Sequence, residues 1–152
     1  MKAVIQRVIN ASVTVNNKIT GKIDSGLLVY LGVAADDTKK DADWLAEKIP
    51  NLRIMNDKEG IMNLSLKETS GNIDTSGILI VSQFTLLADA RKGRRPSWNN
   101  AAPPEKAKEL YEYFIIKIKE QGVHCETGEF QAMMKVNYTN DGPVTILLDT
   151  RD

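Results

Sequence analysis

Strand-like apolar patterns near the amino terminus constrain the fold of this chain more than any other feature. Three stretches alternate between apolar and polar side chains: residues 2–9, 12–15 and 19–23. Residues 27–33 form a nearly unbroken apolar run, which is typical of a strand buried on both faces. Turn residues such as Asn16-Asn17 lie between the alternating stretches. The chain is therefore predicted to begin with an antiparallel sheet.

Two helices are predicted further along the chain. The first begins near Asp36-Asp37-Thr38, where side-chain oxygens can cap the first amides, and ends near Lys48, because Pro50 disfavours helical geometry before it. The second opens at Pro103-Pro104 and is closed by Gly122. One of its faces is an apolar stripe that is interpreted as core packing: Ala107, Leu110, Tyr111, Phe114 and Ile118.

The remaining apolar segments predict further strands. They are residues 52–55, 61–64, 78–87, 123–127, 132–138 and 144–148, the last beginning directly after Gly142-Pro143. The prediction is a single α+β domain over residues 1–152, with a mostly antiparallel, barrel-like sheet and two main helices.

Composition excludes several classes of protein. Hydrophobic residues make up 42% and charged residues 26% of the chain, as in globular proteins. No apolar run has the length of a membrane span, and Lys2 and Arg7 interrupt the amino-terminal apolar stretch, so a cytoplasmic protein without membrane contact is expected. Twenty basic and twenty acidic residues cancel, so any contact with RNA has to be local.

Two polar stretches adjoin apolar strands at distant places in the chain. They are Ser82-Gln83-Phe84-Thr85 and Asn140-Asp141-Gly142-Pro143-Val144-Thr145. Such junctions commonly present backbone groups to a ligand. Thr145 is the obvious nucleophile, but a hydroxyl needs a neighbouring base, and the sequence places no histidine or lysine beside it.

The sequence offers little conventional catalytic machinery. His124 is the only histidine, and it neighbours the single cysteine, Cys125, on a predicted strand where adjacent side chains point to opposite faces. The motifs of zinc hydrolases, α/β-hydrolases and nucleoside triphosphatases do not occur in the sequence. No metal or cofactor is expected, and a mechanism without a side-chain nucleophile has to be considered.

With both polar motifs complete, the chain resembles the D-aminoacyl-tRNA deacylases, also called D-tyrosyl-tRNA(Tyr) deacylases, of the bacterial and eukaryotic type. The family motifs are Ser-Gln-Phe-Thr and Asn-x-Gly-Pro-Val-Thr, and the resemblance extends over the whole chain. Further matching segments are Gln6-Arg7-Val8, Ala11-Ser12-Val13, Arg91-Lys92-Gly93-Arg94-Arg95-Pro96-Ser97 and Leu147-Leu148-Asp149-Thr150.

The resemblance implies an editing hydrolase that cleaves the ester of D-aminoacyl-tRNA, and of glycyl-tRNA mischarged on tRNA(Ala). In the family's mechanism the 2′-hydroxyl of the terminal adenosine activates water, while the protein orients the 3′ acceptor end and places donors near the oxyanion. The implied catalytic residues are Ser82, Gln83, Phe84 (through its main-chain amide), Thr85 and Thr145. A role for Thr145 as the nucleophile is the less favoured alternative.

The resemblance assigns selectivity to Gly142-Pro143, with a cis peptide bond whose neighbouring carbonyls exclude L side chains and tolerate D side chains or glycine. In the family this element enters the active site of the other subunit, which implies a homodimer with active sites at the subunit interface. Arg7 is the candidate anchor of the element. The other supporting residues are Asn140, Val144 and Met134, the last as a pocket wall.

Arg91, Lys92, Arg94 and Arg95 form the only dense basic cluster, and Trp98 follows them. These residues are predicted to bind acceptor-stem phosphates and to stack on a base, whereas a solvated loop is the alternative. Gln131 and Met133 depart from the family pattern Phe-Gly-Ala-x-Met, which usually has Gly and often Asp at these two positions. A side chain in place of glycine changes how closely the ligand can approach.

Two other classes of function remain open. Some eukaryotic members of the family are attributed a nucleic-acid binding or replication-associated role, but these carry a basic tail, and this chain ends at Asp152 without one. A purely structural dimer is the third reading, and it leaves Gly142-Pro143 and the basic cluster without a purpose.

Overall fold

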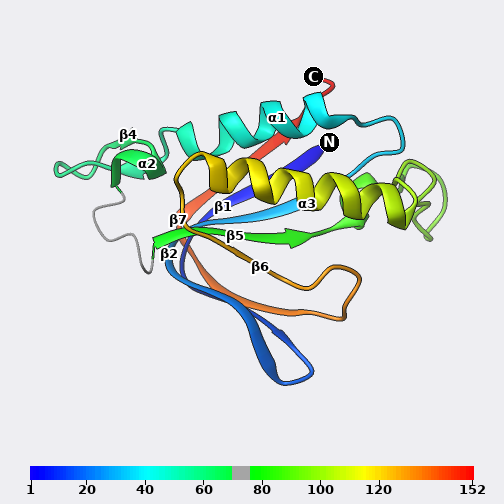
Figure 1. Cartoon of the computed structure of the whole chain (residues 1–152), viewed down its shortest axis with the longest axis horizontal. Coiled ribbons are helices and arrows are strands. Elements are labelled where there is room, and N and C mark those ends of the chain that lie inside the picture. Colours follow the sequence, from blue (N-terminus) through cyan, green and yellow to red (C-terminus); the bar gives the residue numbers. More distant parts are fainter. Residues whose placement is uncertain (70–75) are drawn as a thin grey trace.

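The computed structural model describes residues 1–69 and 76–152. A curved sheet forms one layer, and the helices α1 and α3 lie side by side across one of its faces (Figure 1). In chain order the elements are β1 (Lys2–Val15), β2 (Lys18–Gly32), α1 (Lys39–Lys48), η1 (Ile49–Asn51), β3 (Met55–Asn56), β4 (Met62–Leu64), α2 (Leu66–Thr69), β5 (Ser76–Ser82), η2 (Phe84–Leu87), α3 (Pro104–Glu120), β6 (Cys125–Thr127) and β7 (Lys135–Asp149). The expected α+β class with two main helices is confirmed.

The main sheet is mixed. Its five strands run in the order β6-β5-β2-β1-β7. β1 pairs antiparallel with both β2 and β7, whereas β2–β5 and β5–β6 are parallel. The predicted antiparallel character therefore holds for the β7-β1-β2 half only. The parallel half arises because α1 and α3 carry the chain back across the sheet before β5 and β6 begin.

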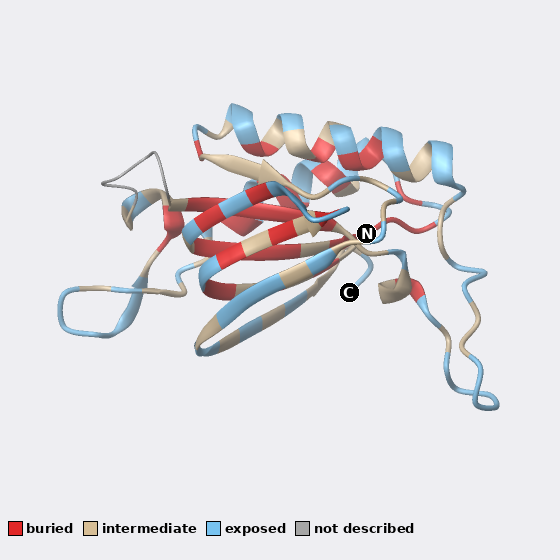
Figure 2. Ribbon diagram, turned by 90° about the horizontal axis from the view of Figure 1, so that it is seen from below, coloured by how far each residue is buried: buried red, intermediate tan, exposed pale blue. Residues whose placement is uncertain are grey.

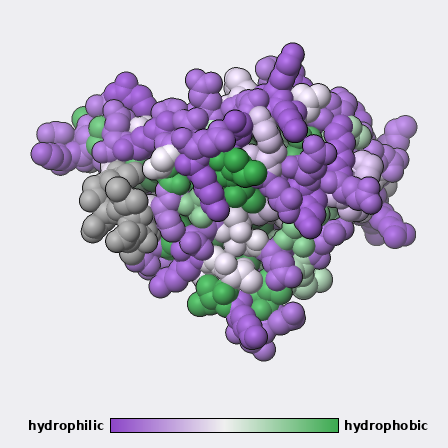
Figure 3. All heavy atoms as spheres, in the orientation of Figure 1, coloured by the Kyte–Doolittle hydropathy of each residue, from purple (hydrophilic) through white to green (hydrophobic). Residues whose placement is uncertain are grey.

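The larger of the two buried hydrophobic clusters lies between the helices and the sheet. Side chains from β1, β2 and β5 pack against the inner faces of α1 and α3, with Phe114 and Leu45 fully buried. Figure 2 shows buried residues along the central strands and on the sheet-facing side of α3. The outer face of the helices is largely hydrophilic, as Figure 3 shows. The apolar stripe predicted for α3 is confirmed as packing, because Leu110, Tyr111, Phe114 and Ile118 are all buried.

The chain ends lie close together beside α1 (Figure 1). The Met1 ammonium group is buried and contacts the Asp37 carboxylate and the Thr150 hydroxyl, each at 2.6 Å. Asp37 also accepts a hydrogen bond from the Ala34 amide at 2.6 Å. The carboxylate thus ties the start of β1 to the turn before α1, whose first residues are capped by contacts between Thr38 and Asp41.

Three predicted strands differ from the structure at the motifs. The predicted strand 78–87 ends at Ser82, and Phe84–Leu87 form a 3-10 helix. The predicted strands 132–138 and 144–148 form one strand, β7, and Gly142-Pro143 lies inside it. A proline can lie within a strand at the edge of a sheet, since no ladder bond is required of its nitrogen there.

Among the described residues, no helix has the length and apolarity needed to cross a membrane.

Candidate active site

A pocket of about 740 Å³ opens between the end of β5, the start of α3 and the segment that leads into β7. Its walls are mainly apolar and include Val81, Ala102, Tyr111, Phe130 and Met134. Ser82, Gln83 and Phe84 line the same pocket. The first predicted motif and the predicted pocket wall Met134 are therefore brought together, although about fifty residues separate them in the sequence.

Close packing against β2 holds the Ser-Gln-Phe-Thr segment in place. The Gln83 amide donates to Leu31 O at 2.8 Å, which extends the β2–β5 pairing by one step. Gly32 permits this approach, because a Cβ there would lie 2.5 Å from Leu87 Cδ2 and 2.9 Å from Gln83 O. The Gln83 side chain donates to the Thr85 hydroxyl. Phe84 then starts a 3-10 helix, whose first amides have no carbonyl partner within the helix.

An aromatic pair stands at the rim of this pocket. The Phe84 side chain is 57% exposed and contacts Trp98 edge to face, with ring centroids 5.3 Å apart. Trp98 belongs to the segment that returns to the pocket wall, since its carbonyl accepts from the Ala101 amide at 2.9 Å. The pair offers exposed aromatic surface beside the motif.

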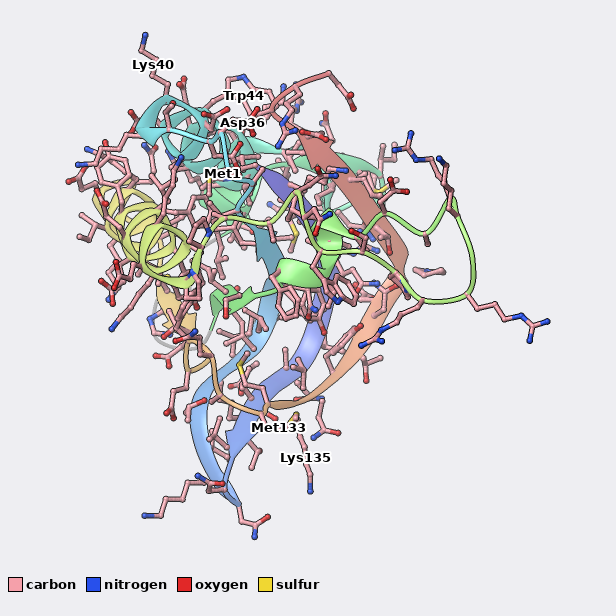
Figure 4. The ribbon with its side chains drawn as sticks, turned by 90° about the vertical axis from the view of Figure 1, so that its right-hand side faces the viewer. Met1, Asp36, Lys40, Trp44, Met133 and Lys135 are labelled. Carbon is pink, nitrogen blue, oxygen red and sulfur yellow. The ribbon has the colours of Figure 1, made fainter. Side chains whose placement is uncertain are left out.

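The basic cluster lies on the segment between η2 and α3, residues 88–102, which we call the basic loop. It projects from the body of the molecule in Figure 4, with all four basic side chains exposed. An antiparallel bridge between Asp89 and Ser97 closes its outer part. Arg91 is paired with Asp89 at 2.6 Å, and hydrogen bonds from Arg91 hold the pKa of Asp89 well below its usual range. Arg94 and Arg95 form no ion pair with any described residue.

The second motif forms a bulge in the edge strand β7. Gln6 pairs with Thr145 and Val8 with Asn140, so the single residue Arg7 of β1 faces residues 141–144 of β7. The Gly142–Pro143 peptide bond is cis, as the family resemblance implies. Gly142 and Pro143 are exposed. We call residues 141–144 the Gly-Pro bulge.

Arg7 lies behind the bulge and is only 7% exposed. Its Nη1 donates to Ile54 O at 2.9 Å and to Asn56 Oδ1 at 3.0 Å. Its Nε lies 3.0 Å from Asp141 Oδ2 in an ion pair that lacks the alignment of a hydrogen bond. A Cβ on Gly142 would come within 3.1 Å of Arg7 Nη2. The guanidinium group therefore packs directly against the bulge.

Asn140 and Thr145 flank the bulge. Asn140 Nδ2 donates to Arg7 O and to Val144 O, each at 3.0 Å, so one side chain spans the bulge. The Thr145 hydroxyl accepts from Gln6 Nε2 at 3.1 Å. No histidine, lysine or carboxylate among the described residues contacts the Thr145 hydroxyl, so the structure places no base beside it.

The two motifs do not meet within one chain. None of residues 140–145 lines the pocket, whereas residues of the first motif do. Sequence reasoning identified both motifs but missed Ile54 and Asn56, the partners of Arg7, and the pocket residues Tyr111 and Phe130. Tyr111 belongs to the apolar stripe of α3, which was interpreted as core packing alone. The stripe gave no sign that Tyr111 also lines the pocket.

The remaining candidates for chemistry are Cys125, His124 and Tyr111, and the first two lie outside the pocket. Burial raises the pKa of Cys125 to about 12, so its thiol stays protonated and is a poor nucleophile at neutral pH. His124 lies 3.5 Å from Glu126 and does not line the pocket. Tyr111 does line it, but burial raises the pKa of its hydroxyl, which donates to Ile80 O at 3.0 Å.

Comparison with known proteins identifies the family of this chain. Residues 4–149 match the family described as D-Tyr-tRNA(Tyr) deacylase. The chain is 61% identical over 151 residues to a D-aminoacyl-tRNA deacylase of Kosmotoga olearia, with 99% of this chain and 98% of that protein covered. It is 60% identical over 152 residues to the D-aminoacyl-tRNA deacylase of Thermosipho melanesiensis, with 99% and 98% covered.

Two solved structures share the fold. One, a c-Myc DNA unwinding element binding protein, is 38% identical with a TM-score of 0.89, and 99% of each chain is covered. The other, described as a probable eukaryotic D-amino acid tRNA deacylase, is 18% identical with a TM-score of 0.80 and 97% coverage of each chain, which supports the fold alone. The chain belongs to the D-Tyr-tRNA(Tyr) deacylase family and is a tRNA-editing hydrolase of the D-aminoacyl-tRNA deacylase class.

Proposed function

We propose that the pocket binds the 3′ aminoacyl-adenosine end of tRNA and that the substrate's own 2′-hydroxyl activates the attacking water. This proposal rests on the chemical nature of the pocket lining. No histidine, cysteine, lysine, aspartate or glutamate is found among its lining residues within the described part of the chain. Hydrolysis in such a pocket needs orientation and oxyanion stabilisation rather than a side-chain base.

The protein's contribution is then a set of oriented donors. The Phe84 main-chain amide, at the first turn of η2, is the proposed oxyanion donor. Gln83 and Ser82 line the pocket beside it, and Thr85 orients the Gln83 side chain through their hydrogen bond. Two well-aimed donors lower a barrier by about 4 kcal/mol, which is about a thousandfold in rate and enough for an activated ester.

The Gly-Pro bulge supplies selectivity in this proposal, and it acts on the pocket of a second subunit. The bulge is exposed, fixed from behind by Arg7, and does not line the pocket of its own chain. A homodimer in which each bulge enters the partner's pocket brings the two motifs together. Backbone that crowds one side of the substrate's α-carbon rejects L side chains without a dedicated pocket for each D side chain. Glycyl-tRNA, including glycine mischarged on tRNA(Ala), is accepted for the same reason.

The basic loop and the aromatic pair are proposed to bind tRNA. Arg94 and Arg95 have their charges available for acceptor-stem phosphates, and Lys92 and Arg91 add to the local potential. Trp98 and Phe84 present ring surface on which a base of the single-stranded acceptor end can stack. Contact of this kind is local, as the zero net charge of the chain requires.

The test is deacylation of matched D-Tyr-tRNA and L-Tyr-tRNA by wild type and Thr145→Ala, with tRNA lacking the terminal 2′-hydroxyl as a third substrate. We expect hydrolysis of the D ester only, within a few-fold of wild type in Thr145→Ala and lost without the 2′-hydroxyl. Loss of activity in Thr145→Ala with retention on the 2′-deoxy substrate would instead assign the attack to the Thr145 hydroxyl.

A nucleic-acid binding role is the second candidate, because a structure of the same fold is that of a DNA unwinding element binding protein. The exposed Arg94 and Arg95 are compatible with either role. The deacylation assay together with a DNA-binding measurement separates the two: DNA binding without hydrolysis of either ester favours the binding role.

A further inference from the structure

The segment that leads from η1 into β3, residues 54–56, contacts the far side of the guanidinium group that faces the Gly-Pro bulge. Ile54 contributes its carbonyl and Asn56 its side-chain oxygen, and both accept from the same nitrogen, Arg7 Nη1. Asn56 is otherwise an exposed residue at the end of β3, in the small β3–β4 sheet. Nothing in the sequence motifs points to it.

Asp141 contacts the guanidinium group from the opposite direction. Its carboxylate is the only one within ion-pair distance of Arg7 among the described residues, at 3.0 Å from Nε. The Asp141 side chain is 48% exposed, whereas that of Arg7 is 8% exposed. Asp141 is also the first residue of the bulge, so the ion pair joins a buried cation to the bulge itself.

These contacts fix Arg7 from two sides. Rotation of the guanidinium group toward solvent would break the contacts with Ile54 O and Asn56 Oδ1 together, because both involve Nη1. The guanidinium group in turn restricts the space beside Gly142, because a Cβ added there would lie 3.1 Å from Arg7 Nη2. A displacement of Asn56 is therefore transmitted to the Gly-Pro bulge through one rigid planar group.

We infer that Asn56 and Asp141 are positioning residues for stereochemical selection: they hold Arg7, and through it the Gly-Pro bulge, in the geometry that excludes L-aminoacyl esters. This inference rests on the proposed function of the bulge. Asn56 neither lines the pocket nor belongs to the bulge, and the Asp141 carboxylate lies 3.0 Å from Arg7 Nε, so both residues act through Arg7. Their substitution changes the choice between D and L esters more than the rate on the D ester.

The test measures kcat/KM for D-Tyr-tRNA and L-Tyr-tRNA in four variants. In Asn56→Ala the D-to-L ratio falls by about tenfold, the scale of one hydrogen bond lost to a charged group. In Asn56→Asp, which retains an acceptor oxygen, the ratio stays near that of wild type. In Asp141→Asn the ratio falls by about threefold, since the lost charge is half exposed and partly screened. The fourth variant is Asn51→Ala, the control.

Asn51 is a matched control because it is a nearby asparagine whose side chain donates to Glu47 O at 2.7 Å and does not contact Arg7. Asn51→Ala should leave the D-to-L ratio unchanged. A purely structural role for Asn56 predicts equal loss on both esters and no change in the ratio. That result, or failure of Asn56→Asp to restore the ratio, overturns the inference.

Hydrogen exchange provides a readout that does not depend on activity. Amide exchange of a peptide covering residues 140–145 should become faster in Asn56→Ala and stay at the wild-type rate in Asn51→Ala. Unchanged exchange in Asn56→Ala contradicts the inference even if the ester assay fails. A wild-type protein that hydrolyses D and L esters equally contradicts the proposed function instead, and the exchange measurement still decides the role of Asn56.

Discussion

The Gly-Pro bulge and the rim of the pocket are both exposed, but they are supported in different ways. The bulge is backed by the nearly buried Arg7, and Asn140 spans it with two hydrogen bonds. The rim, formed by the basic loop and residues 130–134, has exposed side chains such as Arg95 and the 91% exposed Met133. Figure 4 shows Met133 on the segment that leads into β7. A selecting element needs fixed backbone, whereas a surface that attracts a polyanion needs accessible charge.

Replacing Arg7 should cause the largest loss of stability. Arg7→Met keeps the length of the side chain but leaves Ile54 O and Asn56 Oδ1 without their donor and Asp141 without its cation. We expect a loss of about 2–3 kcal/mol in unfolding free energy, less than for a fully buried pair because Asp141 is half exposed. Urea unfolding measures it. The control Arg53→Met removes an exposed arginine bound to Asn63 and should cost less than about 1 kcal/mol. Equal losses in both variants would contradict the anchoring role.

Gly142→Ala should destabilise the protein somewhat less than Arg7→Met but should reduce the selectivity for D over L esters more. Gly142 has φ +121, and the added Cβ would lie 2.9 Å from Val144 Cγ2 and 3.1 Å from Arg7 Nη2. The bulge has to shift, so we expect about 2 kcal/mol of destabilisation and a marked rise in hydrolysis of L-Tyr-tRNA relative to D-Tyr-tRNA.

Gly60→Ala is the matched control for Gly142→Ala. Gly60 also has a positive φ, +78, but an added Cβ would meet nothing within 4 Å. Only the backbone cost remains, about 1 kcal/mol, and ester selectivity should not change. A change in selectivity in Gly60→Ala would show that general destabilisation, not the bulge, controls stereochemistry.

Neutralising the basic loop should act on substrate binding alone. Arg94→Gln together with Arg95→Gln should raise KM for D-Tyr-tRNA several-fold, leave kcat unchanged, and reduce the slope of log KM against log salt by about 1.5 for two lost phosphate contacts. Arg91→Gln should have a smaller effect, because the charge of Arg91 is already matched by Asp89. A fall in kcat without a change in the salt slope would assign these residues to the chemistry instead.

Gln131→Gly should have the smallest effect. Gln131 has φ +63, in the left-handed region that favours glycine. Removal of its side chain relieves that conformation but increases the entropy of the unfolded chain, so stability should rise by less than about 1 kcal/mol. Thermal unfolding checks the sign. KM for D-Tyr-tRNA should change little, because Gln131 is exposed at the pocket rim. A large change in KM would show that its side chain contacts the substrate.

The sequence was sufficient to predict elements whose signals are local. Alternation and apolar runs predicted strand structure over most of β1 and β2, although they divided each strand into two stretches. Proline and glycine marked both ends of α3. The parallel pairing of β5 with β2 was not predicted, because pairing depends on how the intervening helices pack and not on the pattern within a strand. Within the site, the residues of the two family motifs identified the segments around Ser82 and Gly142. The role of Asn56 emerges only from its distance to Arg7, since an asparagine beside a hairpin turn is also an ordinary turn residue.

A mixed dimer shows directly whether each bulge selects substrate in the other subunit's pocket. One subunit carries Ala132→Trp, which fills its pocket, and the other carries Gly142→Ala. Differently tagged chains are co-expressed and the heterodimer is purified through both tags. Its single open pocket then belongs to the Gly142→Ala chain and faces the intact bulge of its partner.

We predict that this heterodimer hydrolyses D-Tyr-tRNA and rejects L-Tyr-tRNA as wild type does, although the Gly142→Ala homodimer does not. The Ala132→Trp homodimer, with both pockets filled, should be inactive on either ester. A heterodimer that hydrolyses L-Tyr-tRNA as readily as the Gly142→Ala homodimer would contradict selection by the partner's bulge, because selection would then occur within one chain.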